Sequence, residues 1–230
     1  MIDQAKAPRP EAPKASRFEY QVTYAPPRGK FTFSPTEIRD LAIATLLVSG
    51  VGLSILGIKL LNIQPLLLII LLALFTSTFL VHEIAHKITA QHYGLWAEFR
   101  LTIIGALITL ISIISPLFKI ISPGAVMIGG TAGKETIGKT SIAGPLTNIV
   151  FCMVAFAFTF FLPYDLMFMA VLTAFFNALI AVLNLIPIGI LDGWKIFQWS
   201  KIIWALAFIT SIILFSALLA QPEYRTILGL

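Results

Sequence analysis

The chain has 230 residues, of which 58% are hydrophobic and 12% are charged. An average soluble domain is about a quarter charged, so this composition excludes an ordinary soluble globule, and its apolar content excludes intrinsic disorder. Residues 1–40 carry twelve of the charged side chains, which leaves fifteen for the other 190 residues. The single cysteine, Cys152, excludes an intramolecular disulfide and a metal site built from several cysteines.

The charge distribution divides the chain into three parts. Residues 1–34 are predicted to form a polar, flexible cytoplasmic segment, 35–220 a transmembrane domain, and 221–230 a short C-terminal tail. Ser34, Pro35 and Glu37 have the spacing of a helix start, with Ser34 as the N-cap and Glu37 completing a capping box. The net charge of +5 does not require nucleic acid, because membrane proteins collect Lys and Arg at their cytoplasmic ends.

Five segments are long and apolar enough to cross a bilayer, which takes about 20 residues in a helix. The predicted fold is therefore an all-α polytopic membrane protein. The expected spans are 41–61, 65–81 running on to His86, 142–162, 166–191 and 202–220.

The segment 101–118 is also uncharged, but its residues argue against a sixth span. It is rich in β-branched isoleucine and threonine, and Gly105, Ser112 and Pro116 disfavour a helix. We therefore expect a small β-hairpin or re-entrant element, continuing to residue 128, between the second and third spans. Such backbone survives at membrane depth only where protein or a water-filled cavity covers it.

The loop charges predict the orientation. With a cytoplasmic N-terminus and five spans, most basic residues fall on the cytoplasmic side, as the positive-inside tendency requires. We expect a multi-pass protein of the cell membrane with its active site toward the cytoplasm. The cytoplasmic set is predicted to comprise Arg28, Lys30, Arg39, Lys87, Arg100, Lys119, Lys134, Lys139, Lys195 and Lys201.

The second span ends in the sequence His-Glu-Ile-Ala-His. His82 and His86 are four residues apart, so both face one side of a helix and can bind one metal ion. Glu83 lies beside that metal, where it can act as a general base on a water molecule, as in the zinc-protease motif. Three ionisable groups in an apolar helix are costly unless paired or metal-bound, which argues against a chance match.

A catalytic zinc usually takes a third protein ligand. His92 has the spacing of a third histidine in some soluble proteases, but Thr89 stands where that motif needs glycine, so we expect His92 to point away. Asp192 is the better candidate. With five spans, the second and fourth helices run in the same direction and bring Asp192 to the depth of His82 and His86.

These residues resemble the site-2 protease family of intramembrane zinc metalloproteases. The resemblance covers roughly residues 65–193 and combines the His-Glu-x-x-His motif with AGPLTN at 143–148 and NLIPIGILDG at 184–193. It implies that Asp192 is the third zinc ligand, that Asn184 holds the substrate main chain, and that Asn148 is a weaker candidate for substrate binding. Many members carry a PDZ or CBS domain, and we expect neither within these 230 residues.

The sequence thus predicts an endopeptidase with one zinc ion, cutting within or near transmembrane segments of other proteins. Its expected partners are a transmembrane protein substrate and the lipid bilayer, with no nucleic acid, and its oligomeric state is not predicted. In the expected mechanism Glu83 accepts a proton from the attacking water and passes it to the leaving amine. The alternatives are a metal- or proton-binding membrane transporter and a catalytically inactive zinc-binding scaffold.

Overall fold

The computed structural model describes residues 31–57, 64–115 and 119–228. Most of the expected N-terminal segment therefore lies outside the described residues. Eight helices and one two-stranded sheet make up the described part. In chain order these are α1 (Pro35–Leu56), α2 (Pro65–His92), β1 (Trp96–Leu101), α3 (Ile103–Ile114), β2 (Gly124–Gly129), α4 (Lys134–Phe158), α5 (Tyr164–Leu185), α6 (Asp192–Trp199), α7 (Lys201–Ala220) and α8 (Pro222–Leu228).

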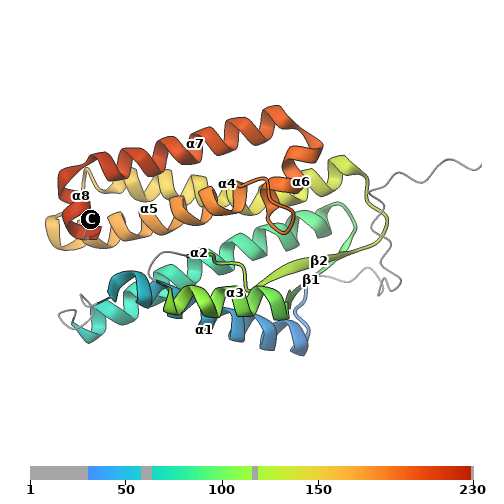
Figure 1. Cartoon of the computed structure of the whole chain (residues 1–230), viewed down its shortest axis with the longest axis horizontal. Coiled ribbons are helices and arrows are strands. Elements are labelled where there is room, and N and C mark those ends of the chain that lie inside the picture. The colour runs from blue at the N-terminus through green and yellow to red at the C-terminus, as the bar shows by residue number, and fades with distance from the viewer. Residues whose placement is uncertain (1–30, 58–63, 116–118, 229–230) are drawn as a thin grey trace, which may run out of the picture.

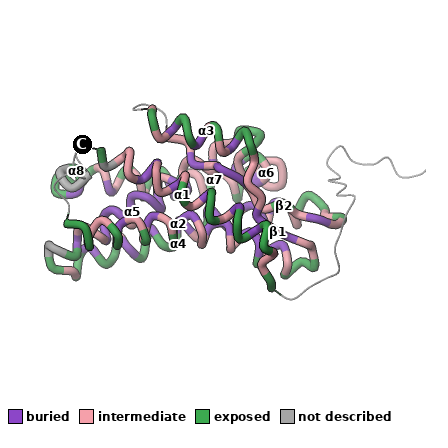
Figure 2. Tube along the Cα trace, turned by 90° about the horizontal axis from the view of Figure 1, so that it is seen from below, coloured by how far each residue is buried: buried purple, intermediate pink, exposed green. Residues whose placement is uncertain are grey.

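Five of the described helices are long and apolar enough to cross a membrane, which confirms the expected number. They are Pro35–Ile55, Pro65–His92, Lys134–Phe158, Leu166–Leu185 and Lys201–Ala220. Figure 1 shows them as a layered bundle, with α7 on one side, α4 and α5 next to it, then α2, and finally α1 with α3. Buried residues follow the inner faces of this bundle, while large apolar side chains are exposed on its outer faces, as expected of surfaces that face lipid (Figure 2).

The start of α1 follows the predicted capping pattern only in part. The Ser34 side chain accepts a hydrogen bond from the Glu37 N–H at 3.1 Å, so Ser34 is the N-cap. The Glu37 carboxylate does not complete a capping box, because its oxygens bind elsewhere. One accepts from the Lys87 ammonium at 2.5 Å and the other from the Phe99 N–H at 3.0 Å, so this buried side chain ties α1 to α2 and β1.

The element between α2 and α4 is re-entrant, and it differs from a simple hairpin. Strands β1 and β2 pair antiparallel from Trp96 opposite Gly129 to Leu101 opposite Gly124, but the 12-residue helix α3 stands between them. The expected small antiparallel pair is therefore present, but the argument against a helix between residues 101 and 118 was wrong for 103–114. At 1.5 Å per residue α3 is about 18 Å long, too short to cross a hydrocarbon core of about 30 Å.

Tertiary hydrogen bonds explain why this β-branched segment is helical. Thr102 caps α3 by accepting from the Gly105 N–H at 3.2 Å. Two hydroxyl groups of α3 then hold the chain that returns to β2: Ser112 accepts from the Ile120 N–H at 3.0 Å and Thr109 from the Ser122 N–H at 3.3 Å. A helix satisfies its own backbone and leaves these side chains free to bind the return segment, which outweighs a weak local propensity.

The re-entrant path also corrects the expected position of Lys119. Its ammonium donates to the Ser54 hydroxyl at 2.8 Å and to the Ser112 carbonyl at 2.9 Å. Ser54 lies near the end of α1 that is remote from the sheet, so Lys119 does not lie at the sheet end with the other basic residues. Helix α3 leads away from the sheet, and a hydroxyl and a carbonyl group bind the ammonium near its far end.

Helix α5 ends at Leu185, six residues before the predicted end of the fourth span. Pro187 disfavours a helical residue before it, and the Trp204 indole N–H donates to the buried Leu185 carbonyl at 2.8 Å. Residues 186–191 then form an irregular connection to α6. Both α2 and α5 run toward the end of the bundle that carries the sheet and α6 (Figure 1), so the two helices share one direction, as the parity of the crossings predicted.

Candidate metal centre

Two histidines of α2 form the core of the site. His82 and His86 lie one helical turn apart, and both are buried, with 2% and 5% of their surface exposed. Their Nε2 atoms are 3.1 Å apart, so the two rings converge on one point. The i, i+4 spacing therefore places both imidazole rings on one face of α2, as the sequence predicted.

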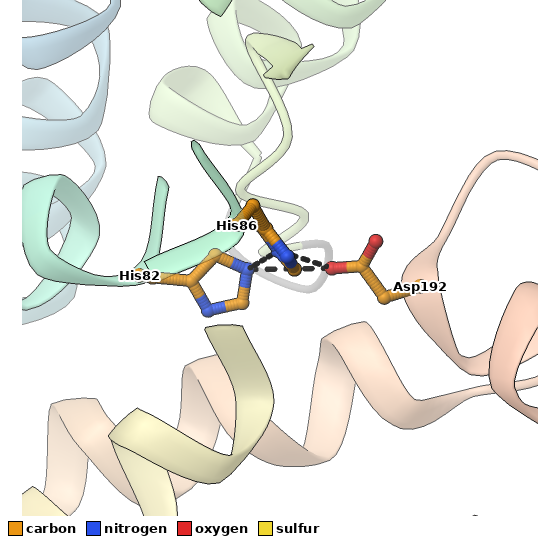
Figure 3. Close-up of side chains that lie close together, drawn as sticks. All are labelled: His82, His86 and Asp192. Atoms are coloured by element: carbon orange, nitrogen blue, oxygen red, sulfur yellow. Dashed lines mark hydrogen bonds and ion pairs between the residues drawn. The ribbon is translucent and has the colours of Figure 1, made fainter. Parts of the chain in front are cut away.

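Asp192 completes the group from the first residue of α6. Its Oδ2 atom lies 2.9 Å from His86 Nε2 and 3.4 Å from His82 Nε2. The three donor atoms all lie within 4.8 Å of one another, and Figure 3 shows the carboxylate facing the two rings. The structure thus brings together the three residues predicted as metal ligands, although Asp192 belongs to a short separate helix.

The opposite ring nitrogens determine what the converging atoms can do. His86 Nδ1 lies 2.8 Å from the Thr140 carbonyl oxygen, which can only accept, so this nitrogen carries the proton. His82 Nδ1 lies 2.5 Å from Asn148 Oδ1. The Asn148 amide faces this way because its Nδ2 donates to Asn177 Oδ1 at 2.9 Å. With each Nδ1 carrying a proton, the neutral form of both imidazoles points an Nε2 lone pair inward.

Two nitrogen lone pairs and one carboxylate oxygen thus face one another without a proton donor between them. Three acceptors at such distances repel unless a cation lies among them. Two imidazoles and a carboxylate are a usual protein ligand set for catalytic zinc, and hydrogen bonds at the remote ring nitrogens are the usual way of orienting such histidines. The residues present therefore fit a zinc ion.

The Asp192 carboxyl is prepared to act as an anionic ligand. Burial opposes its ionisation, whereas the Lys195 ammonium beside it favours the anion and lowers its pKa. The two oxygens have separate contacts: Oδ2 faces the histidines, and Oδ1 lies 3.4 Å from the Lys195 ammonium.

The backbone of α4 comes unusually close to the histidine rings. A Cβ atom at Gly144 would lie 2.7 Å from His82 Nε2 and closer still to His86 Nε2. Any larger residue would occupy the space on which the donor atoms converge. Glycine at this position therefore lets α4 cover the site and still leave room for an ion.

A cavity adjoins the cluster and contains the other predicted functional residues. Glu83 and Asn184 line it together with His86 and Asp192. Glu83 is buried, with 8% of its surface exposed, and Asn184 donates through Nδ2 to the Ile180 carbonyl at 3.1 Å. The roles predicted for Glu83 and Asn184, base and substrate binding, remain predictions.

Asn148 and His92 lie outside this cavity lining. Asn148 is buried and forms a hydrogen bond with His82, one of the candidate metal ligands. Its substrate-binding role remains a prediction. His92 ends α2 on the exposed surface, with its ring against Tyr93 at a centroid distance of 5.4 Å. It points away from the metal site, as predicted, because the helix continues through Thr89.

The sequence analysis missed two contributors to the site. Asn177 anchors the Asn148 amide, and the Thr140 carbonyl holds His86. The sequence contains an indication of the role of Asn177: it lies seven residues before Asn184 in an uncharged span, so the two side chains share one helix face. The Thr140 carbonyl had none, since every residue carries this group.

Comparison with known proteins agrees with this geometry. One relative is a protein of Methanocaldococcus jannaschii named "Putative zinc metalloprotease MJ0611", which is 34% identical over 179 residues, spanning 76% of this chain and 91% of the relative. The chain belongs to this zinc metalloprotease family. Its five apolar helices make it a multi-pass membrane metalloprotease, and zinc is the metal that its donor set supports. No family profile and no solved structure matches the chain.

Proposed function

We propose that this metalloprotease is an intramembrane zinc endopeptidase of the site-2 protease kind, which hydrolyses peptide bonds within or near transmembrane segments of membrane proteins. The observation that carries the proposal is the position of the cluster. His82, Glu83 and His86 all lie on α2, a helix long and apolar enough to cross the membrane. The scissile peptide bond of a substrate must therefore approach a membrane-spanning helix before these groups can act on it.

The catalytic roles follow from the cavity. Zinc would be held by His82, His86 and Asp192, and would supply a Lewis acid for the scissile carbonyl and a lowered pKa for water. Glu83 lines the same cavity as Asp192 and does not contribute to the three-donor cluster. It is therefore free to accept the proton of the attacking water and to transfer it to the leaving amine.

An extended substrate needs a backbone partner, and β1 is not available for this purpose. The N–H of Phe99 donates to Glu37 at 3.0 Å and the N–H of Leu101 donates to Asp40 at 3.2 Å. Two carboxylates of α1 therefore occupy the outer edge of β1. Blocking an edge with carboxylates prevents another strand from pairing there.

The outer edge of β2 is the remaining site for strand addition. The antiparallel register places Val126 opposite Phe99, so the backbone groups of Gly124, Val126 and Ile128 point away from β1. No other strand of the described chain pairs with this edge, and these three residues line the cavity beside Glu83. In our proposal the unwound substrate adds to β2, and Asn184 across the cavity holds its main chain.

A reporter assay tests the proposed activity. Purified wild type should cleave a membrane protein with one transmembrane segment, and a zinc chelator should stop cleavage. The Glu83→Gln variant should retain stoichiometric zinc and lose cleavage by about 10²-fold or more, because general acid–base catalysis contributes about 10² to 10⁴. Cleavage by this variant at the wild-type rate would refute the mechanism, and loss of its zinc would make Glu83 a ligand.

The proposed orientation has a separate test. We place the sheet end of the bundle on the cytoplasmic side of the cell membrane. Cysteines introduced at Lys134 and Lys201, after replacement of Cys152, should react with an impermeant reagent from the cytoplasm. Cysteines at Gln64 and Gln221, at the other ends of α2 and α7, should react only from the opposite side. The reverse pattern would invert the proposed topology.

A further inference from the structure

The cavity contains one cation that the mechanism above does not use. Lys195 lines it together with Glu83 and Asp192, and among the described lining residues it is the only Lys or Arg. Its side chain is 30% exposed, so the ammonium is neither fully solvated nor fully enclosed. The cavity therefore has one positive side chain next to two acidic ones.

The contact between Lys195 and Asp192 leaves the ammonium free for another partner. Nζ lies 3.4 Å from Asp192 Oδ1, whereas a charge-assisted N–H···O bond is ordinarily about 2.7–2.9 Å. An ammonium has three donors, and this long contact engages one of them.

Its place in the helix also argues against a purely stabilising role. Lys195 lies in the first turn of α6, which begins at Asp192. The positive end of a helix dipole disfavours a cation there. Lys195 nevertheless lines the cavity from this position, where its charge can meet a bound ligand.

We propose that Lys195 is a catalytic residue that binds the oxygen of the scissile carbonyl and stabilises the negative charge developing on it. This assignment rests on the proposed endopeptidase function. In the first step the water oxygen bonds to the carbonyl carbon, one water proton moves to Glu83, and the carbonyl π electrons move to the oxygen beside Lys195. In the second step the C–N bond breaks, its electron pair and a proton from Glu83 go to the nitrogen, and a carboxylic acid and an amine result.

The matched variants are Lys195→Met, which keeps the length and removes the charge, and Lys195→Arg, which keeps the charge. Loss of one oxyanion donor costs about 10² to 10³ in kcat, so Lys195→Met should lower kcat by about 10²-fold with KM and bound zinc unchanged. Lys195→Arg should retain more activity than Lys195→Met. Lys201→Met is the control, because Lys201 is an exposed cation at the start of α7 that does not line the cavity.

A binding measurement gives a readout that does not depend on turnover. The carboxylate of the N-side product is the stable anion nearest to the proposed oxyanion. In zinc-loaded Glu83→Gln protein, adding Lys195→Met should weaken binding of a product peptide acid by about tenfold and leave binding of the peptide amide unchanged. An equal effect on both peptides would show that Lys195 does not bind this anion.

The outcomes separate this inference from the proposed function. Failure of the wild type to cleave any membrane reporter would refute the endopeptidase itself. Cleavage by wild type together with normal kcat in Lys195→Met would refute the role of Lys195 alone. Zinc loss in Lys195→Met in proportion to its loss of activity would also refute it, because Lys195 would then act only by positioning Asp192.

Discussion

The hydrogen bond between Asn148 and His82 provides a quantitative test of the metal site. Asn148 is buried, accepts from His82 Nδ1 at 2.5 Å, and donates to Asn177 and to the Thr78 carbonyl at 2.9 and 3.3 Å. Leucine has the same branched arrangement of four side-chain heavy atoms but none of these polar groups. Loss of such an orienting partner typically weakens metal affinity 10- to 100-fold, which corresponds to about 1.4–2.8 kcal/mol.

The Asn148→Leu variant should therefore bind zinc 10- to 100-fold more weakly than wild type. Competition against a chelator of known affinity, with protein in detergent, measures this ratio directly. The variant should also have a lower melting temperature. Asn177 and the Thr78 carbonyl each lose a hydrogen-bond donor, and each unsatisfied buried group costs about 1–3 kcal/mol of folding stability. Affinity and stability are thus two separate effects of one substitution.

Two further variants separate those effects. Asn148→Asp keeps an acceptor for His82 and removes the donors, so it should retain zinc affinity while losing stability. Asn184→Leu makes the same side-chain change on α5, where the amide contacts the Ile180 carbonyl and no metal ligand, so its zinc affinity should equal wild type. Wild-type zinc affinity in Asn148→Leu would refute the orienting role, and the position would then be better explained by substrate binding.

Three other predictions address the ligand set, the helix contact and the ion pair. Asp192→Ala should lower zinc content and cleavage together, whereas His92→Ala should change neither, and metal analysis showing the reverse would overturn the ligand assignment. Gly144→Ala should reduce zinc affinity at least tenfold in a folded protein, because its Cβ would lie 2.7 Å from an imidazole nitrogen; unchanged affinity would mean that α4 moves instead. Glu37→Gln should destabilise the fold by about 3–5 kcal/mol, because Lys87 keeps a buried charge without its counter-ion, and Lys87→Met in the same chain should restore most of this loss. A Glu37→Gln melting temperature equal to wild type would contradict that reasoning.

Several features could be read from the sequence because they depend on local or periodic patterns. Five apolar segments predicted five spanning helices, since hydrocarbon requires each segment to satisfy its own backbone. The spacing of His82 and His86 placed both rings on one helix face for the same geometric reason. Parity of the crossings then brought Asp192 to the same end, without any knowledge of how the helices pack.

Other features depend on which groups meet across the bundle. Residues 103–114 form a helix because hydroxyls at Thr109 and Ser112 hold the returning chain, a contact that β-branched composition does not reveal. The tautomers of the metal ligands likewise depend on Asn148 and the Thr140 carbonyl, which come from α4, more than 50 residues away in the chain. The sequence alone predicted the candidate ligands and the helix count. Tertiary packing decided how these side chains are oriented and how the segment between α2 and α4 folds, because hydrogen bonds between distant segments have no periodic signature in the chain.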